Sequence, residues 1–278
     1  MNSLRLPAKS GVESVLVIAG FDPSGCAGVL ADLRHLAALK VHGEAVISAV
    51  TFQSSQEFVG YRPLPVEWLD GQLTPILAGS RPRITKAGML GNAATVKWLA
   101  EKADKSLGRL VLDPVLRATR GGDLIDQEGI HALRRHLLPL TFAVTPNLGE
   151  AEALSGMERI ENLEGMKAAA RKISTLGARH IIITGGHFKG DCPDLWHHGS
   201  EFMLFRSPRV ETDKVRGIGT LFSAALAGYL ARGKAFSDAL LAAKRHVVEA
   251  LLERERDDTG PLVLPANRHE VEIEVREI

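Results

Sequence analysis

Two glycines stand directly before a helix of small apolar residues, at Gly217-Ile218-Gly219-Thr220, in this 278-residue chain. Glycine has no Cβ, so the backbone at such a turn can approach a ligand closely. The first N–H groups of the helix, predicted at 220–231, lack acceptors within the helix and lie at the positive end of its dipole. The turn is therefore a candidate site for an anion such as a phosphate. The same residues would also serve as a plain turn into a tightly packed helix, since short glycine motifs often occur by chance.

Other polar residues follow apolar runs that are expected to be buried strands. In an open parallel sheet, ligands bind beyond the carboxyl ends of the strands. The polar residues at these predicted ends are Asp22, Gln53, Asp113, Asn147, Glu150, Thr184 and the 217–220 turn. Their shared location predicts one site, and this convergence carries more weight than any single motif. Taken alone, an acid at a strand end is commonly a cap or a solvent-exposed residue.

Short apolar runs alternate with helical patterns along the chain. The expected strands are 15–19, 45–50, 84–89, 110–112, 142–145 and 181–184, and the expected helices are 27–39, 65–77, 93–103, 127–136, 149–154, 164–176, 220–231 and 237–253. Strands separated by helices form right-handed βαβ units, so the pattern predicts an α/β fold with a mostly parallel sheet covered on both faces. Residues 194–197 and 202–205, split by Gly199-Ser200, are expected to form a β-hairpin.

No stretch resembles an interdomain linker or a repeat. We therefore predict a single domain over 1–278, with an N-terminal extension at 1–13 and a C-terminal tail at about 258–278. The tail ends in HEVEIEVREI, where charged and apolar residues alternate. This pattern is typical of an added edge strand or an ordered tail, and its charge argues against a place in the core.

Composition excludes several classes of function. Lys and Arg number 34 against 33 Asp and Glu, so neither a nucleic-acid surface nor an anionic-membrane surface is predicted. The apolar runs are far shorter than a membrane span, and the N-terminus lacks the apolar region of a signal peptide. Cys26 and Cys192 cannot build a disulfide framework, and no metal-ligand spacing surrounds them. His197-His198 is expected in a hairpin rather than a zinc site. We expect a cytoplasmic protein without a protein-only metal cage.

Several motifs occur together and in order. They are AGFDPSGCAGVLADL from Ala19, VTFQ ending at Gln53, KAGML from Lys86, LDPV from Leu112, TPNLGEA from Thr145, Gly185-Gly186-His187 and the GIGT turn. The combination resembles the hydroxymethylpyrimidine/phosphomethylpyrimidine kinases of thiamine biosynthesis, over about 14–251. The resemblance implies a ribokinase-like three-layer sandwich, ATP and Mg²⁺ as cofactors, a small pyrimidine substrate and a homodimer.

The resemblance also assigns a substrate pocket residue by residue. It implies that Gln53 hydrogen-bonds the aminopyrimidine, because an amide offers both a donor and an acceptor to a ring nitrogen beside an amino group. Gly20, Asp32, Met89 and Val115 resemble the rest of that pocket. Taken alone, Gln53 would more often be an ordinary polar residue at a strand end.

A second set of residues is assigned to the phosphates. Asp113 and Glu150 match family acids near magnesium, an ion that prefers hard oxygen ligands and often keeps water between. Asn147 lies beside them in the pattern. Gly217, Gly219 and Thr220 match the turn that stabilises the transferring phosphate.

Three positions depart from the family pattern. Thr220 stands where the family usually has a Cys that is expected to act as the base, and Thr184 stands where it usually has a Lys that serves the phosphates. Arg216 stands where the family commonly has His, and its charge is a candidate replacement at the nucleotide. A threonine hydroxyl cannot act as a general base near neutral pH.

These departures shape the functional prediction, which is ATP-dependent phosphorylation of hydroxymethylpyrimidine, its monophosphate or both. Loss of a base, typically worth about 10²–10⁴-fold, should hurt the neutral alcohol more than the monophosphate, whose oxygen is already anionic. Two rivals stay open. One is a pyridoxal-type kinase, and the other is a catalytically impaired pyrimidine- or nucleotide-binding homologue in which Thr184 and Thr220 mark decay.

Overall fold

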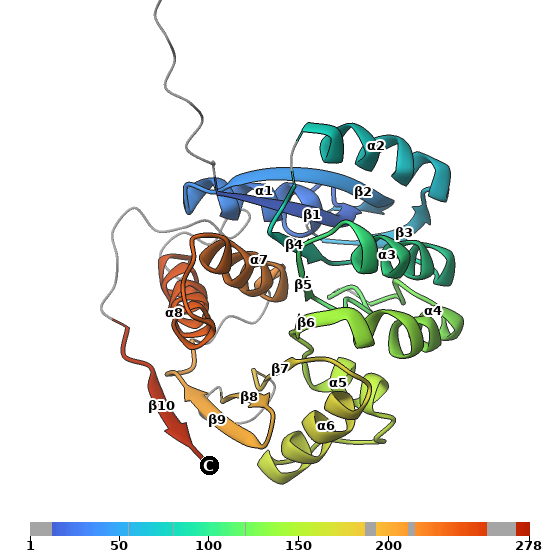
Figure 1. Ribbon diagram of the computed structural model, residues 1–278. Coiled ribbons are helices and arrows are strands. Elements are labelled where there is room, and N and C mark those ends of the chain that lie inside the picture. Colours follow the sequence, from blue (N-terminus) through green and yellow to red (C-terminus); the bar gives the residue numbers. More distant parts are fainter. Residues whose placement is uncertain are drawn as a thin grey trace, which may run out of the picture.

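A computed structural model of the protein describes residues 13–54, 56–79, 81–119, 121–186, 193–210, 215–254 and 271–278. One ten-stranded sheet runs through it in the order β10-β9-β8-β7-β6-β5-β4-β1-β2-β3 (Figure 1). The strands are β1 (Ser14–Phe21), β2 (His42–Gln53), β3 (Phe58–Pro63), β4 (Ile84–Ala87), β5 (Arg109–Leu112), β6 (Thr141–Val144), β7 (His180–Thr184), β8 (Asp194–His198), β9 (Glu201–Arg206) and β10 (Glu274–Glu277). The helices are α1 (Gly28–Ala38), α2 (Val66–Gly79), α3 (Ala93–Lys105), α4 (Gln127–Ala132), α5 (Leu148–Ser155), α6 (Leu163–Thr175), α7 (Ile218–Ala231) and α8 (Phe236–Arg254).

The central strands β2, β1, β4, β5, β6 and β7 pair in parallel, whereas β3 at one edge and β8, β9 and β10 at the other pair antiparallel. The chain first moves outward from β1 to β2 and β3, and then returns to place β4 on the other side of β1. The order of strands therefore reverses between β1 and β4, which is where ligands bind in open sheets of this kind.

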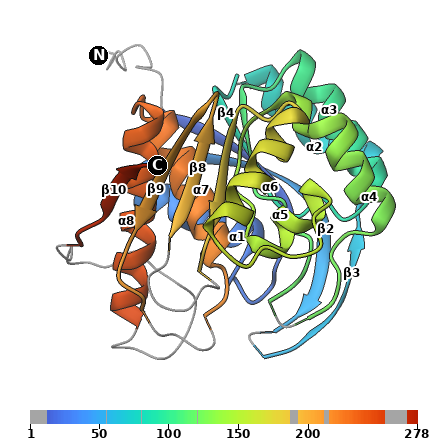
Figure 2. The same ribbon diagram turned by 90° about the horizontal axis from the view of Figure 1, so that it is seen from below.

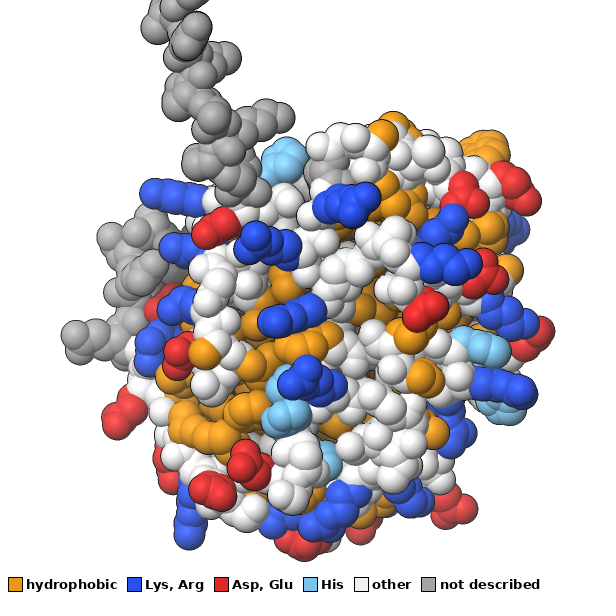
Figure 3. Space-filling view, viewed as in Figure 1, with side chains coloured by type: hydrophobic (Ala, Val, Ile, Leu, Met, Phe, Trp, Pro, Cys, Tyr) orange, Lys and Arg blue, Asp and Glu red, His pale blue; other side chains and the backbone are white. Residues whose placement is uncertain are grey.

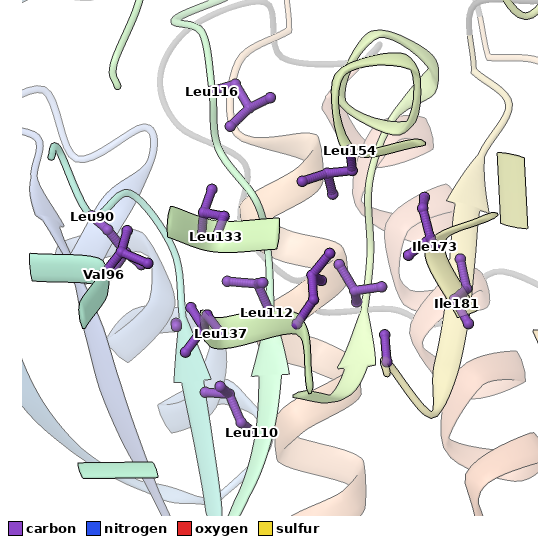
Figure 4. Close-up of a cluster of buried hydrophobic side chains, with 14 of the residues drawn as sticks. Leu90, Val96, Leu110, Leu112, Leu116, Leu133, Leu137, Leu154, Ile173 and Ile181 are labelled. Atoms are coloured by element: carbon purple, nitrogen blue, oxygen red, sulfur yellow. The ribbon is translucent and has the colours of Figure 1, made fainter. Parts of the chain in front are cut away.

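Side chains along each strand alternate between two cores. In β1, Val15 and Val17 belong to the core beneath α1, α7 and α8, whereas Leu16 and Ile18 belong to the core beneath α2 to α6. Figures 1 and 2 show these two groups of helices on opposite faces of the sheet. In the second core, Leu110 and Leu112 of β5 lie near Leu133 and Leu137 (Figure 4). The predicted three-layer α/β sandwich is thereby confirmed.

Four helices, α3 to α6, begin at a side-chain cap. Asn92, Asp126, Asn147 and Asn162 each accept a hydrogen bond from an N–H three residues ahead, as is usual at a helix start. The helices α1 and α7 have no such side-chain cap. Both begin beside the pocket described below, so the uncapped helix starts coincide with the candidate site.

The structure departs from the sequence prediction in a few elements. No strand was expected at β3, a half-exposed edge strand with a glycine inside and a proline at its end, both of which weaken a strand pattern. The strand expected at 84–89 ends at Ala87 instead. The helix expected at 127–136 turns into a π-helical segment, Leu133–Leu137, followed by a 3₁₀ turn, Leu138–Leu140.

Both predicted edge elements are confirmed where the structure describes them. His197 and His198 lie in the expected hairpin of β8 and β9, and the last residues of the tail form β10 antiparallel to β9. Cys26 is buried and has no disulfide partner among the residues that the structure describes. Cys192, His187, the extension up to residue 12 and the tail before residue 271 lie outside the described residues.

Of the helices that the structure describes, none has the length and apolarity to cross a bilayer. Charges of both signs are interspersed on the face seen in Figure 3.

Candidate active site

A pocket lies at the reversal point of the sheet, beyond the carboxyl ends of β1, β2 and β4. It holds about 390 Å³ of empty space, part of which is open to solvent. The sequence-predicted residues that line it are Gly20, Asp22, Gln53, Met89, Val115 and Thr220. A Cβ at Gly20 would stand 2.8 Å from the Met89 sulfur, so a larger residue at Gly20 would displace that wall of the pocket.

The loop after β1 is organised by the buried carboxylate of Asp22. Its Oδ1 accepts hydrogen bonds from the Ser24 N–H at 2.9 Å and the Ser24 hydroxyl at 2.7 Å, and its Oδ2 accepts one from the Ala27 N–H at 3.1 Å. Short acidic side chains commonly close turns in this way. The carboxylate thereby holds the loop against the start of α1 and forms one wall of the pocket.

Gln53 stands at the end of β2 with both ends of its amide bonded. Its nitrogen donates to the Thr51 hydroxyl at 2.9 Å, and its oxygen accepts a hydrogen bond from the Arg216 guanidinium. Thr51 in turn donates to the carbonyl of Phe21 at 3.0 Å. The amide that the sequence assigns to the pyrimidine is therefore held in place by two side chains.

The turn before α7 needs glycine at its first position. Gly217 has a φ of +83°, and a Cβ there would stand 1.9 Å from the carbonyl oxygen of Cys26. Only glycine tolerates both conditions. The turn therefore packs directly on the β1–α1 loop. A Cβ at Gly219 would stand 3.8 Å from Asp113 Oδ1, so the first turn of α7 faces the acid predicted to lie near the metal.

A cluster of buried charges lies against the pocket. Lys86 Nζ stands 2.9 Å from Asp32 Oδ2 and 3.8 Å from Asp113 Oδ2. Ser223 of α7 donates its hydroxyl hydrogen to Asp113 Oδ2 at 3.0 Å. Burial raises the pKa of Asp113, and it raises the pKa of Asp32 to about 6 against the opposing attraction of Lys86. The lysine therefore favours the ionised form of both carboxylates.

Asn147 and Glu150 form a capping box at the start of α5. Asn147 Oδ1 accepts from the Glu150 N–H at 3.0 Å, and Glu150 Oε2 accepts from the Asn147 N–H at 2.9 Å. Thr184 ends β7 next to them, and its N–H donates to the carbonyl of Pro146 at 2.9 Å. Burial, followed by the negative charge of Asp113, raises the pKa of Glu150 to about 8.

The pair of Asp113 and Glu150 fits a magnesium site. When both carboxylates are ionised, their negative charges repel each other, which destabilises the pair. A divalent cation beside them would offset this repulsion. Mg²⁺ is commonly held by one or two carboxylates together with water and phosphate oxygens. Within the described ranges, no cluster of three or more His, Cys, Asp or Glu could hold a metal ion by itself. Water and phosphate would therefore complete the coordination.

A family model described as phosphomethylpyrimidine kinase matches residues 22–263. The chain is 38% identical over 243 residues to the hydroxymethylpyrimidine/phosphomethylpyrimidine kinase of Bacillus subtilis, covering 86% of this chain and 89% of that protein. The chain belongs to the phosphomethylpyrimidine kinase family. The enzyme of the same name from Haemophilus influenzae is 37% identical over 249 residues, covering 87% and 92%. The thiamine biosynthesis bifunctional protein ThiED of Geobacter sulfurreducens is also 37% identical, but the chain spans only 50% of its length.

Solved structures show the same fold. Pyridoxal kinase from Staphylococcus aureus, in complex with AMP-PCP and pyridoxal, has a TM-score of 0.87 and 33% sequence identity, covering 96% of this chain and all of that chain. Phosphomethylpyrimidine kinase from Clostridium difficile has a TM-score of 0.75 and 30% identity, covering 86% and 99%. The predicted family, the ribokinase-like fold and the phosphotransferase class are thereby confirmed.

Four residues that the family resemblance assigns to the site lie in three different places in the structure. Asp32 lies beneath the pocket rather than on its wall, bonded to Lys86. Asn147 and Thr184 lie together at the ends of β6 and β7. Arg216, which was grouped with them as a candidate nucleotide residue, instead contacts Gln53 beyond β2. Because β1, β4 and β5 separate β2 from β6 in the sheet, the guanidinium of Arg216 lies on the side of Gln53 and away from Asn147 and Thr184.

Two residues of the site were given no role by the sequence argument. Lys86 was part of a motif, and its position in a wholly buried strand was a usable signal, because buried lysine requires a charged partner. Ser223 gave no signal, since its partner Asp113 lies 110 residues away.

Proposed function

We propose that the protein is a kinase that transfers the γ-phosphoryl group of ATP to hydroxymethylpyrimidine, to its monophosphate or to both. The observation that carries this proposal is the pocket at the β1–β4 reversal, which is lined both by the anchored amide of Gln53 and by Thr220, the last residue of the glycine turn. Family membership supports the reaction class, and the kinase neighbour solved with AMP-PCP supports ATP as the donor.

The proposed acceptor lies between Gln53 and the 217–220 turn. Gln53 binds the aminopyrimidine edge through its amide, while Gly20, Met89 and Val115 contact the ring. The N–H groups at the start of α7 hold the transferring phosphoryl group, because they lack a side-chain cap and lie at the positive end of the helix dipole. Asp32 acts from beneath the pocket by fixing Lys86.

Magnesium and the nucleotide lie on the other side of the turn in this proposal. Asp113 and Glu150 would hold Mg²⁺, which when bound neutralises negative charge on the phosphates. Ser223 fixes the carboxylate of Asp113, and Asn147 fixes that of Glu150. Thr184 lies near the phosphates but brings no charge.

The absence of a base at Thr220 sets the expected preference between the two acceptors. Phosphoryl transfer depends mainly on positioning and charge stabilisation, which the turn and Mg²⁺ still provide. An alcohol must lose a proton during the reaction, whereas a phosphate monoester is already anionic near neutral pH. We therefore propose that the monophosphate is the better acceptor.

Pyridoxal is the second candidate acceptor. The observation that favours it is the TM-score of 0.87 to a pyridoxal kinase over 96% of the chain. A binding protein without turnover is the third reading, since Thr184 and Thr220 both replace expected catalytic groups. The homodimer is a further proposal, which light scattering of the purified protein tests directly.

Measurement of ATP consumption with product identification tests the proposed function. Hydroxymethylpyrimidine, its monophosphate and pyridoxal are offered separately with Mg²⁺ and ATP. Formation of a phosphorylated pyrimidine supports the proposal, and turnover of pyridoxal alone replaces it with the second candidate. Binding of a pyrimidine without any turnover would contradict the kinase proposal.

A further inference from the structure

The side chain of Arg216 joins segments that are far apart in the sequence. It is only 7% exposed. One terminal nitrogen bonds the Gln53 amide oxygen and stands 3.4 Å from Asp22 Oδ2. The other bonds the Ser54 carbonyl and stands 3.4 Å from the Ser24 hydroxyl. Arg216 also directly precedes Gly217 in the chain. It therefore lies between the residue proposed to hold the pyrimidine and the turn proposed to hold the transferring phosphoryl group.

The charge of this guanidinium is only weakly neutralised by its surroundings. Its one acidic partner, among the bonds and ion pairs described for it, is Asp22, at 3.4 Å, where close charge-assisted bonds are usually about 2.7–2.9 Å long. Asp22 already accepts three hydrogen bonds from its own loop. The oxygens of Gln53 and Ser54 are neutral. Burial of a cation with so loose a counterion is costly, so a second anion at this place would be stabilising.

One donor of the guanidinium is also unused. Within the part of the chain that the structure describes, Arg216 Nε is buried and has no hydrogen-bond partner. Buried donors without a partner are uncommon and destabilising. The hydrogens of the two terminal nitrogens already face Gln53, Asp22, Ser54 and Ser24, so Nε–H is the donor left for a further acceptor. An anionic phosphate oxygen fits this donor, because a hydrogen bond between a guanidinium and a phosphate is charge-assisted.

We propose that Arg216 binds the phosphate group of a phosphate-monoester acceptor and thereby determines the specificity of the pocket for that acceptor over the neutral alcohol. This inference rests on the proposed function. When Gln53 holds the ring, the phosphate of the monoester lies between Gln53 and the turn, where an alcohol places only its hydroxyl. The guanidinium then offsets the repulsion between this phosphate and the incoming phosphoryl group.

The chemistry balances without a protein base. An anionic oxygen of the acceptor phosphate forms the new bond to the γ-phosphorus of ATP, the bond from that phosphorus to the bridging oxygen breaks, and ADP leaves with the electron pair. No proton has to be removed from the acceptor, because the second pKa of a phosphate monoester is about 6. Arg216 and Thr220 thus favour the same acceptor. Arg216 supplies a cation that attracts an anionic acceptor, and an anionic acceptor does not need the base that Thr220 lacks.

The experiment measures equilibrium binding of hydroxymethylpyrimidine and of its monophosphate by titration calorimetry, without nucleotide. The variants are Arg216→Gln, Arg216→Lys and the control Arg34→Gln. Arg34 is a second arginine that bonds the same loop, at the carbonyl of Gly25 (2.9 Å), and its Nε is likewise buried and unbonded, but among the described hydrogen bonds it has none to Gln53. Thermal melts of all variants establish that each is folded.

We expect Arg216→Gln to weaken binding of the monophosphate about 10–100-fold, as expected for loss of a hydrogen bond to a charged group. Binding of the alcohol should weaken by only about threefold, through the lost bond that holds Gln53. Arg216→Lys should restore part of the monophosphate affinity, because it keeps the charge and loses the planar fork. Arg34→Gln should alter both ligands equally and slightly.

Two results would overturn the inference. Equal weakening of both ligands by Arg216→Gln would show that Arg216 only holds the loops of the pocket together. No effect on either ligand would show that it has no role in binding. A wild-type protein that binds neither pyrimidine would overturn the proposed function together with the inference, whereas wild-type turnover of the pyrimidines combined with equal weakening would overturn the inference alone.

Discussion

The two ends of the candidate site are built in different ways. The proposed acceptor end, formed by Asp22, Gln53 and Arg216, depends on side-chain bonds between loops more than 160 residues apart in sequence. The proposed donor end, formed by Asn147, Glu150 and Thr184, depends on a capping box within one helical turn and on neighbouring strand ends. The acceptor end has an arginine where the resemblance leads us to expect His, and the donor end has a neutral threonine where it leads us to expect Lys. In the proposed arrangement, positive charge is thus placed at the acceptor rather than at the nucleotide.

The largest effect is expected from the residue that faces both ends. Asp113→Asn removes the carboxylate that we propose as a ligand of Mg²⁺, and it should lower kcat about 10²–10³-fold for any acceptor. The matched control is Ser223→Ala, which removes only one hydrogen bond to that carboxylate and should cost about tenfold or less. Equal losses in both variants, or no loss in Asp113→Asn, would contradict the assignment of the metal to this acid.

The backbone of the acceptor end should be less tolerant of change than that of the donor end. Gly217→Ala places a methyl group against the Cys26 carbonyl at a φ of +83° and should lower the free energy of unfolding by about 2–4 kcal/mol. Gly149→Ala is the matched change at the donor end, where the nearest atom to the new methyl group would be Asn147 Oδ1 at 3.6 Å, and it should cost less than about 1 kcal/mol. Denaturant unfolding measures both. Equal costs would contradict the contrast between the two ends.

Restoring a base should change the balance between the acceptors. Thr220→Cys returns the residue that the family resemblance assigns to this position and should raise kcat for hydroxymethylpyrimidine by about 10². Turnover of the monophosphate should change by less than about threefold, since that acceptor has no proton to lose. Thr220→Ser is the control, because it keeps a hydroxyl. A uniform gain for both acceptors would count against the argument from the missing base.

The smallest effect is expected from returning charge to the donor end. Thr184→Lys should lower KM for ATP about tenfold through one new charge-assisted bond to phosphate, and the gain should fall as salt is added. Thr184→Ala should leave KM for ATP within about threefold of wild type. An unchanged KM in the lysine variant would mean that the nucleotide does not lie where we propose.

The contrast between the two ends also explains what the sequence could predict. The capping box could be read from an Asn followed three residues later by Glu, and the central strands could be read from apolar runs such as 15–19, because both patterns are local. The edge strand β3 could not be predicted, because a half-exposed strand shows little alternation of apolar and polar residues in the sequence. The bonds of Arg216 could not either, since its partners come together only after β1, β2 and α7 have packed. The place of Arg216 directly before Gly217 marks it as a candidate site residue, whereas its bond to Gln53 is visible only in the fold.

The most direct test of the central claim is the ratio of kcat/KM for the monophosphate to kcat/KM for hydroxymethylpyrimidine, measured on the wild-type protein with saturating Mg²⁺ and ATP. A cation at the acceptor end and the lack of a base at Thr220 both favour the anionic acceptor, so we predict a ratio of at least about 10². A ratio near one, or a preference for the alcohol, would contradict the claim that this kinase places its charge for a phosphorylated acceptor.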